Sequence, residues 1–162
     1  MVKFLGGAAV AMPQNDTYEA LQKGVVEGTF APIETLKGWR QAEVVKYTTE
    51  CTDVGYTTSM FVVMNVDKWN ALPNDLKEMI EGVSEEWVDV HGAAWDKSDA
   101  EGRAYTLSEG NSIIALSEEE NQRWAKAVSP VIEDYIKTTE EKGLTGKKAV
   151  ATVKELLTKY SE

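Results

Sequence analysis

The longest regular pattern of apolar positions starts after Pro73 and predicts one helix that runs to about Ser108. Apolar residues recur there at steps of four, three, four, three and four, which is the spacing of one helix face. They are Leu76, Ile80, Val83, Trp87, Val90 and Ala94. At the α-helical rise this helix would be ~50 Å long, so we expect it to span more than one small lobe.

Sustained heptads along this helix also permit a coiled coil. Glycine and alanine interrupt the apolar seam, however, and this favours a helix packed within a domain. We expect Gly82, Gly92 and Gly102 to mark bends or positions of close packing.

The N-terminal third predicts a helix, a short strand, a turn and a second helix. A capping box at Asp16 starts the first helix, and a left-handed residue near Gly24 ends it. Residues 25–26 are extended, and a second helix covers 32–41 after a proline at its start. The gap at Thr29–Ala31 is a candidate ligand site, because ligands of open α/β folds bind where strands end.

The rest of the chain alternates strands with helices. Strands are predicted over 43–49, 56–64 and 111–116, and helices over 66–71, 117–139 and 147–160. The second half of 56–64 is continuously apolar, which is typical of a strand buried on both faces of a parallel-rich sheet. Asn65 and Ser117 cap the helices that follow them, and Pro130 kinks the longer one. The predicted fold class is therefore helix-rich α/β with few strands.

Composition narrows the possible functions. The 17 Lys and Arg residues against 27 Asp and Glu give a net charge of −10, which argues against nucleic acid and anionic membranes as partners. Cys51 is the only cysteine and most simply a small buried hydrophobe, and His91 is the only histidine. No nucleophile–base spacing stands out, so we predict no enzyme, no metal site and no cofactor. No run approaches the ~20 apolar residues that a transmembrane helix needs.

Three phrases carry a resemblance to a known family. They are YEALQKGVVEG before a proline, AEVVKY at 42–47 and VVMNVDKWNALP at 62–73. In this order and spacing they resemble the solute-binding proteins of TRAP transporters, the DctP-like family. The resemblance implies a two-lobed, type II-like periplasmic protein that closes on a small organic acid, such as a dicarboxylate, and delivers it to a membrane permease.

The resemblance also bears on the ends of the chain. Lys3 and the apolar run 4–12 imitate a short signal peptide, but the family pattern instead implies a helix end, a turn and a strand over 8–12. Family members are about twice as long, and 1–162 resembles only their C-terminal portion, without the first lobe and part of the second. The family's ligand-clamping arginine has no match among Arg40, Arg103 and Arg123, which all lie on predicted helices. We therefore expect this portion alone to hold a carboxylate weakly, and its sequence does not identify the ligand.

Candidate ligand-binding residues follow from the match to the family. They are Gln14, Phe30, Ala31, Glu34, Tyr56, Thr57 and Ser59. The cleft would be lined by the Gln14 amide, by the aromatic ring of Phe30 and by the carboxyl group of Glu34 in the first turn of a helix. The hydroxyls of Tyr56, Thr57 and Ser59 would lie at the start of a strand. Sialic-acid-binding members carry an asparagine near Ala31, so sialic acid is not expected. Each residue also has a structural explanation, as a turn residue, a core residue, a complement to the helix dipole or an ordinary strand residue.

A second hypothesis belongs to a different class of protein. Uncovered sheet edges and apolar helix faces of a truncated lobe invite pairing with a second copy. Exchange of identical elements would then give a symmetric, domain-swapped homodimer. In this interpretation the chain is a helical self-associating interaction domain without a ligand.

Overall fold

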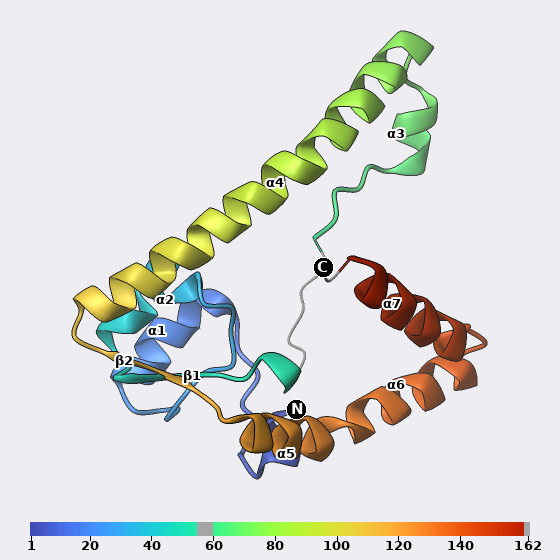
Figure 1. The fold of residues 1–162 in the computed structure, drawn as a ribbon. Coiled ribbons are helices and arrows are strands. Elements are labelled where there is room, and N and C mark those ends of the chain that lie inside the picture. Colours follow the sequence, from blue (N-terminus) through green and yellow to red (C-terminus); the bar gives the residue numbers. More distant parts are fainter. Residues whose placement is uncertain (55–59, 161–162) are drawn as a thin grey trace. The chain divides into compact units, whose positions relative to one another are not determined.

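The computed structural model describes residues 1–54 and 60–160, which divide into two compact units (Figure 1). Unit 1 contains the described parts of Met1–Val10, Cys51–Gly55 and Leu116–Glu162. Unit 2 contains those of Ala11–Glu50 and Tyr56–Ala115. Each unit is thus assembled from segments that lie far apart in the sequence.

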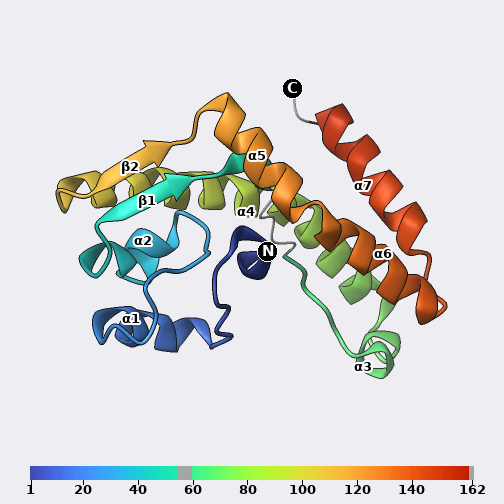
Figure 2. The same cartoon turned by 90° about the horizontal axis from the view of Figure 1, so that it is seen from below.

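Unit 2 combines helices with a small parallel sheet. Its elements are α1 (Gln14–Gln22), α2 (Thr35–Gly38), the 3-10 helix η2 (Gln41–Glu43), β1 (Tyr47–Glu50), α3 (Val66–Asn70), α4 (Asn74–Ser108) and β2 (Ser112–Ala115). Strands β1 and β2 pair in parallel, with Tyr47 opposite Ser112 and Glu50 opposite Ala115. Figure 2 shows the two strands side by side. The helix-rich α/β class with few strands and one long helix is confirmed.

The regular elements among the described residues of unit 1 are all helices. It contains η1 (Val2–Leu5), η3 (Thr52–Val54), α5 (Glu118–Val128), α6 (Pro130–Glu141) and α7 (Gly146–Tyr160). Helix α5 packs against both short 3-10 helices, and α6 packs against α7. Val54 and Val128 are buried in this unit, which places its small core along one side of α5.

The two cap predictions outside the N-terminal third are confirmed. The Asn65 side chain accepts hydrogen bonds from the backbone N–H groups of Asp67 and Lys68 at the start of α3. The Ser117 hydroxyl accepts one from the N–H of Glu120 at the start of α5. Caps of this kind depend on residues two or three positions apart, so the sequence alone carries the signal.

Three helix predictions were wrong in their limits. Helix α1 begins at Gln14 instead of Asp16, because the Pro13 carbonyl already accepts the Asp16 N–H at 3.1 Å. The predicted helix 32–41 is only the four-residue α2, since Arg40 adopts a left-handed φ of 57° and lies outside any helix. The predicted helix 117–139 is divided at Ser129, where Pro130 starts a new helix instead of bending the old one.

Several predicted strands are absent from the described residues. Segments 8–12, 25–26 and 60–64 have no strand conformation, while 56–59 lie outside the described residues. The strand predicted over 43–49 starts later than expected, because the Val44 and Val45 N–H groups donate to the Gln41 carbonyl and extend the η2 turn. β1 therefore starts only at Tyr47. A strand needs a partner to bond with, and propensity alone does not supply one.

Helices α2 and α4 approach each other closely at Gly102. A Cβ atom at Gly102 would lie 2.5 Å from the Ile33 carbonyl oxygen, so close packing is confirmed at this glycine. Around it the Glu34 N–H donates to Asp99 Oδ1 at 3.2 Å, and Lys37 Nζ pairs with Glu101 at 2.7 Å. The C-terminal third of α4 therefore fixes the loop that leads into α2.

The buried centre of unit 2 is largely polar. Gln41 and Thr106 are fully buried, and the Thr106 hydroxyl donates to the Gly102 carbonyl at 2.8 Å. The buried Asn111 side chain donates to the Ala42 carbonyl at 2.6 Å, and so joins the end of α4 to η2. The Asn111 bond is therefore a buried polar contact between segments 69 positions apart.

Gly102→Ala is expected to lower the free energy of unfolding by about 1–3 kcal/mol, because the new methyl group would force the backbone near Ile33 to shift. The same change at Gly92 meets nothing within 4 Å and is expected to raise stability slightly, since alanine is the better helix former. Urea unfolding followed by circular dichroism measures both. Equal effects at the two glycines would contradict the close approach of α4.

Candidate functional site

The loop between α1 and α2 carries three of the predicted ligand-binding residues. Phe30 and Ala31 are half-buried in this loop, and Glu34 directly precedes α2. The loop ends in a fixed turn, because the Thr35 hydroxyl donates to the Pro32 carbonyl at 2.7 Å. The turn brings Phe30, Ala31 and Glu34 onto one short, well-anchored segment.

Among the candidate site residues that the structure describes, Glu34 is the one whose pKa is shifted by its surroundings. Its Oε2 folds over Gly38, at 2.7 Å from the place a Cβ would take there. Burial of the carboxyl group, and then the nearby charge of Asp99, raise the pKa of Glu34 above its usual value. Both effects disfavour the charged form of this carboxyl group.

The remaining predicted site residues lie elsewhere. Gln14 is the first residue of α1 and half-buried, and its Nε2 has no hydrogen-bond partner in the described part of the chain. Tyr56, Thr57 and Ser59 lie outside the described residues. The site as a whole stays a prediction, in which the α1–α2 loop is the part with known geometry.

A second polar cluster, which sequence reasoning missed, joins α1, α4 and η2 around the carboxylate of Glu43. Arg40 donates to both carboxylate oxygens, from Nε at 2.7 Å and from Nη2 at 2.9 Å. The hydroxyls of Tyr18 and Tyr105 donate to the same carboxylate at 3.1 and 3.2 Å. The Arg40 guanidinium also lies 5.6 Å from the centre of the Tyr18 ring.

The contacts within this cluster shift the pKa values of its members. The hydrogen bond from Arg40 is the main reason why the pKa of Glu43 is lowered, and burial followed by the Glu43 interaction raises the pKa of Tyr18. The spacing of three residues between Arg40 and Glu43 was a usable sequence signal. Tyr105 lies 62 positions from Glu43, and no local pattern could have found that contact.

Five cations of unit 2 form ion pairs with acids of the same unit. The ion pairs are Lys23–Glu19, Lys37–Glu101, Lys97–Glu101, Arg40–Glu43 and Arg103–Glu50. A carboxylate ligand would have to displace an existing partner to use any of these cations. The α1–α2 loop itself, from Thr29 to Glu34, contributes no positive charge.

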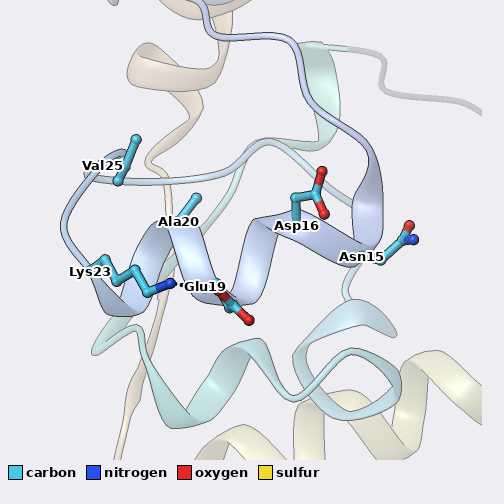
Figure 3. Close-up of a pocket in the computed structure, with 6 residues that line it drawn as sticks. All are labelled: Asn15, Asp16, Glu19, Ala20, Lys23 and Val25. Atoms are coloured by element: carbon cyan, nitrogen blue, oxygen red, sulfur yellow. Dashed lines mark hydrogen bonds and ion pairs between the residues drawn. The ribbon is translucent and has the colours of Figure 1, made fainter.

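A shallow hollow of about 290 Å³ lies beside α1 (Figure 3). It is lined by Asn15, Asp16, Glu19, Ala20, Lys23 and Val25. Lys23 and Glu19 point toward each other there and form an ion pair of 2.6 Å. None of the predicted site residues lines this hollow, so it does not coincide with the candidate site.

Residues 1–54 and 60–160 contain neither a candidate metal site nor a membrane-spanning helix. No group of three or more His, Cys, Asp or Glu side chains in this range could hold a metal ion. No helix in it combines the length and the apolar character required to cross a membrane.

Solved structures place this fold among solute-binding proteins. A TRAP periplasmic solute-binding protein from Desulfovibrio salexigens is 32% identical with a TM-score of 0.78, and the match covers 98% of this chain and 49% of that one. A marine metagenome TRAP protein specific for aromatic acid ligands, in complex with metahydroxyphenylacetate, is 28% identical with a TM-score of 0.82. That match covers 99% of this chain and 52% of the other.

The sequence matches identify the family. Residues 1–138 match bacterial extracellular solute-binding protein family 7, DctP, and the chain belongs to this family. A C4-dicarboxylate-binding periplasmic protein DctP from Rhodobacter capsulatus is 29% identical over 128 residues, which is 78% of this chain. The match covers 38% of that relative, so this chain spans well under two thirds of its length.

The stabilising effect of Glu43 is expected to depend on pH. Because its pKa is lowered in the folded state, Glu43 contributes stability above its usual pKa of 4.5 and loses that contribution as the pH falls through the folded-state value. The loss in unfolding free energy caused by Glu43→Gln should therefore be constant near neutral pH and shrink below about pH 4.5. Urea unfolding from pH 7 to pH 3 measures it.

The matched control is Glu85→Gln, which removes the same charge from the exposed part of α4. A Glu43→Gln effect that keeps its full size down to pH 3 would contradict the Arg40–Glu43 geometry.

Proposed function

We propose that residues 1–162 form the C-terminal portion of an extracytoplasmic solute-binding subunit of a TRAP transporter. The intact protein would capture a small organic acid in the periplasm and deliver it to a membrane permease. The observation that carries this proposal is the family match over 1–138, supported by similarity to TRAP solute-binding structures over nearly the whole chain. The relatives' greater length supports the assignment to a portion.

In this proposal the chain binds and moves without catalysing a reaction. Closure of two lobes would be a hinge motion selected because the closed form has the higher affinity for the ligand. Phe30 would form an apolar wall and the small Ala31 would leave room beside it. Glu34 and Gln14 would hydrogen-bond to polar atoms of the ligand, and the hydroxyls of Tyr56, Thr57 and Ser59 would lie at the mouth.

The charges of unit 2 support weak binding by this portion alone. A buried carboxylate is held well only when a cation or several donors replace its water. The five ion-paired cations of unit 2 are already engaged, and Glu34 adds an acid to the site. No arginine of this portion matches the family's ligand-clamping position, so the countercharge for the ligand would come from polypeptide outside these 162 residues.

The relatives support two carboxylate classes for the ligand. The Rhodobacter relative is named for C4-dicarboxylates and the marine protein for aromatic acids. The same countercharge would serve one carboxylate in either class. The proposal is therefore made for organic carboxylates as a group, with both classes as probes.

Calorimetric titration of the 162-residue chain with benzoate and with succinate is expected to detect no tight complex. The protein extended by the residues that its gene encodes upstream is expected to bind one of these carboxylate classes stoichiometrically. The reason is the missing cation, which the extension would supply. A tight, stoichiometric complex of the 162-residue chain alone would contradict the proposed division.

In the extended protein, Phe30→Ala and Glu34→Ala are each expected to raise the Kd about tenfold, which is ~1.4 kcal/mol of binding free energy. The thermal unfolding midpoint should change little, because both side chains are only half-buried. Glu19→Ala, in the hollow beside α1, is the control and should leave the Kd unchanged. Normal binding by both loop variants would overturn the site assignment.

A further inference from the structure

Two acids lie together where the α1–α2 loop leads into α2. The Glu34 N–H donates to Asp99 Oδ1 at 3.2 Å, and the charge of Asp99 acts on the Glu34 carboxyl group. Both residues belong to unit 2, so their contact lies within one unit. This Glu34–Asp99 pair is therefore held at the end of the loop that carries Phe30 and Ala31, in the part of the candidate site with known geometry.

The Glu34–Asp99 pair is not neutralised by a cation of its own. None of the ion pairs in the described part of the chain includes Glu34 or Asp99. The basic side chain on which Asp99 acts is Arg103, but the hydrogen bond from Arg103 to Glu50 is the main reason why the pKa of Arg103 is raised. The charge of Asp99 is the weakest of the causes. One arginine thus serves two acids, and the pair keeps a net negative charge.

The carboxyl group of Glu34 shows how this place treats a negative charge. Burial, and then the charge of Asp99, raise the pKa of Glu34 above its usual value. Both effects act on any carboxylate brought to the same place, whether it belongs to the protein or to a ligand. A ligand carboxylate there would also meet the charge of Glu34 itself.

The hydrogen-bond donors at the start of α2 already have acceptors. The Glu34 N–H donates to Asp99, and the hydroxyl and N–H of Thr35 both donate to the Pro32 carbonyl, at 2.7 and 3.2 Å. The Lys37 N–H donates to the Glu34 carbonyl at 3.1 Å. An anion at this place would have to break one of these bonds to gain a donor.

The loop before the pair offers apolar contacts instead. Phe30, Ala31, Pro32 and Ile33 follow one another and are half-buried. Contact between such side chains and an apolar ligand removes both from water, which is favourable without any charge on the ligand. The chemistry of this segment therefore suits the uncharged body of a ligand.

We propose that the site selects a monocarboxylate with an apolar body and rejects a dicarboxylate. The single carboxylate would face the countercharge outside this chain, and the apolar body would lie against the loop at Phe30 and Ala31. The second carboxylate of a dicarboxylate would come to the Glu34–Asp99 pair, where the described part of the chain supplies no cation. This inference rests on the proposed function and chooses between the two carboxylate classes considered there.

Matched ligands test this selection in the protein extended by its upstream coding residues. Butyrate and succinate have the same carbon chain, and succinate differs in its second carboxylate. Benzoate and isophthalate form the corresponding aromatic pair. Calorimetric titration at neutral pH is expected to show that butyrate and benzoate bind at least ~100-fold more tightly than their dicarboxylate partners, because an unpaired carboxylate is costly to bury.

Two substitutions that remove charge but keep shape locate the source of the selection. Glu34→Gln and Asp99→Asn are each expected to lower the preference for butyrate over succinate by ~10-fold, because each removes one negative charge from the pair. Asparagine at position 99 can still accept the Glu34 N–H, so the loop keeps its anchor. The control is Glu19→Gln in the hollow beside α1, which should leave the preference unchanged.

The possible failures are distinguishable. Succinate binding as tight as butyrate binding would overturn the selection and leave the proposed solute-binding function in place. A preference that stays the same in both Glu34→Gln and Asp99→Asn would overturn the role of the pair. An extended protein that binds none of these carboxylates would overturn the proposed function together with this inference.

Discussion

The close approach of α4 to the carbonyl of Ile33 is the contact on which the arrangement of unit 2 depends. Only a residue without a Cβ fits between the two backbones, so Gly102 sets the distance between α4 and the loop before α2. Once that distance is fixed, the turn of α4 that ends at Gly102 supplies Asp99 to the Glu34 N–H and Glu101 to Lys37. The geometry of the candidate site thus follows from a helix packed at one end only.

The polar centre of unit 2 explains why so small a core can be specific. Buried apolar residues of this unit are few and include Leu21, Leu36 and Ala42. The buried groups of Thr35, Thr106 and Asn111 instead donate hydrogen bonds to backbone carbonyls. Such bonds specify geometry, while each adds only about 1 kcal/mol to stability.

The sequence predicted what depends on neighbouring residues and failed where the outcome depends on distant ones. The caps at Asn65 and Ser117 and the limits of α4 follow from local spacing and were correct. The strand over 60–64 was wrong because a strand exists only with a partner, and Arg40 was misplaced on a helix because its left-handed turn serves a contact with Glu43. For the candidate site, the sequence could place Glu34 at a helix start, but its contact with Asp99 joins residues 65 positions apart.

Two properties of unit 2 agree with the proposal that this chain is a portion of a longer protein. Leu76, Ile80, Val83, Trp87 and Val90 of α4 are exposed among the described residues, and the α1–α2 loop from Thr29 to Glu34 contributes no positive charge. In our proposal the countercharge comes from polypeptide outside this chain, which is why the 162-residue portion alone would hold a carboxylate weakly.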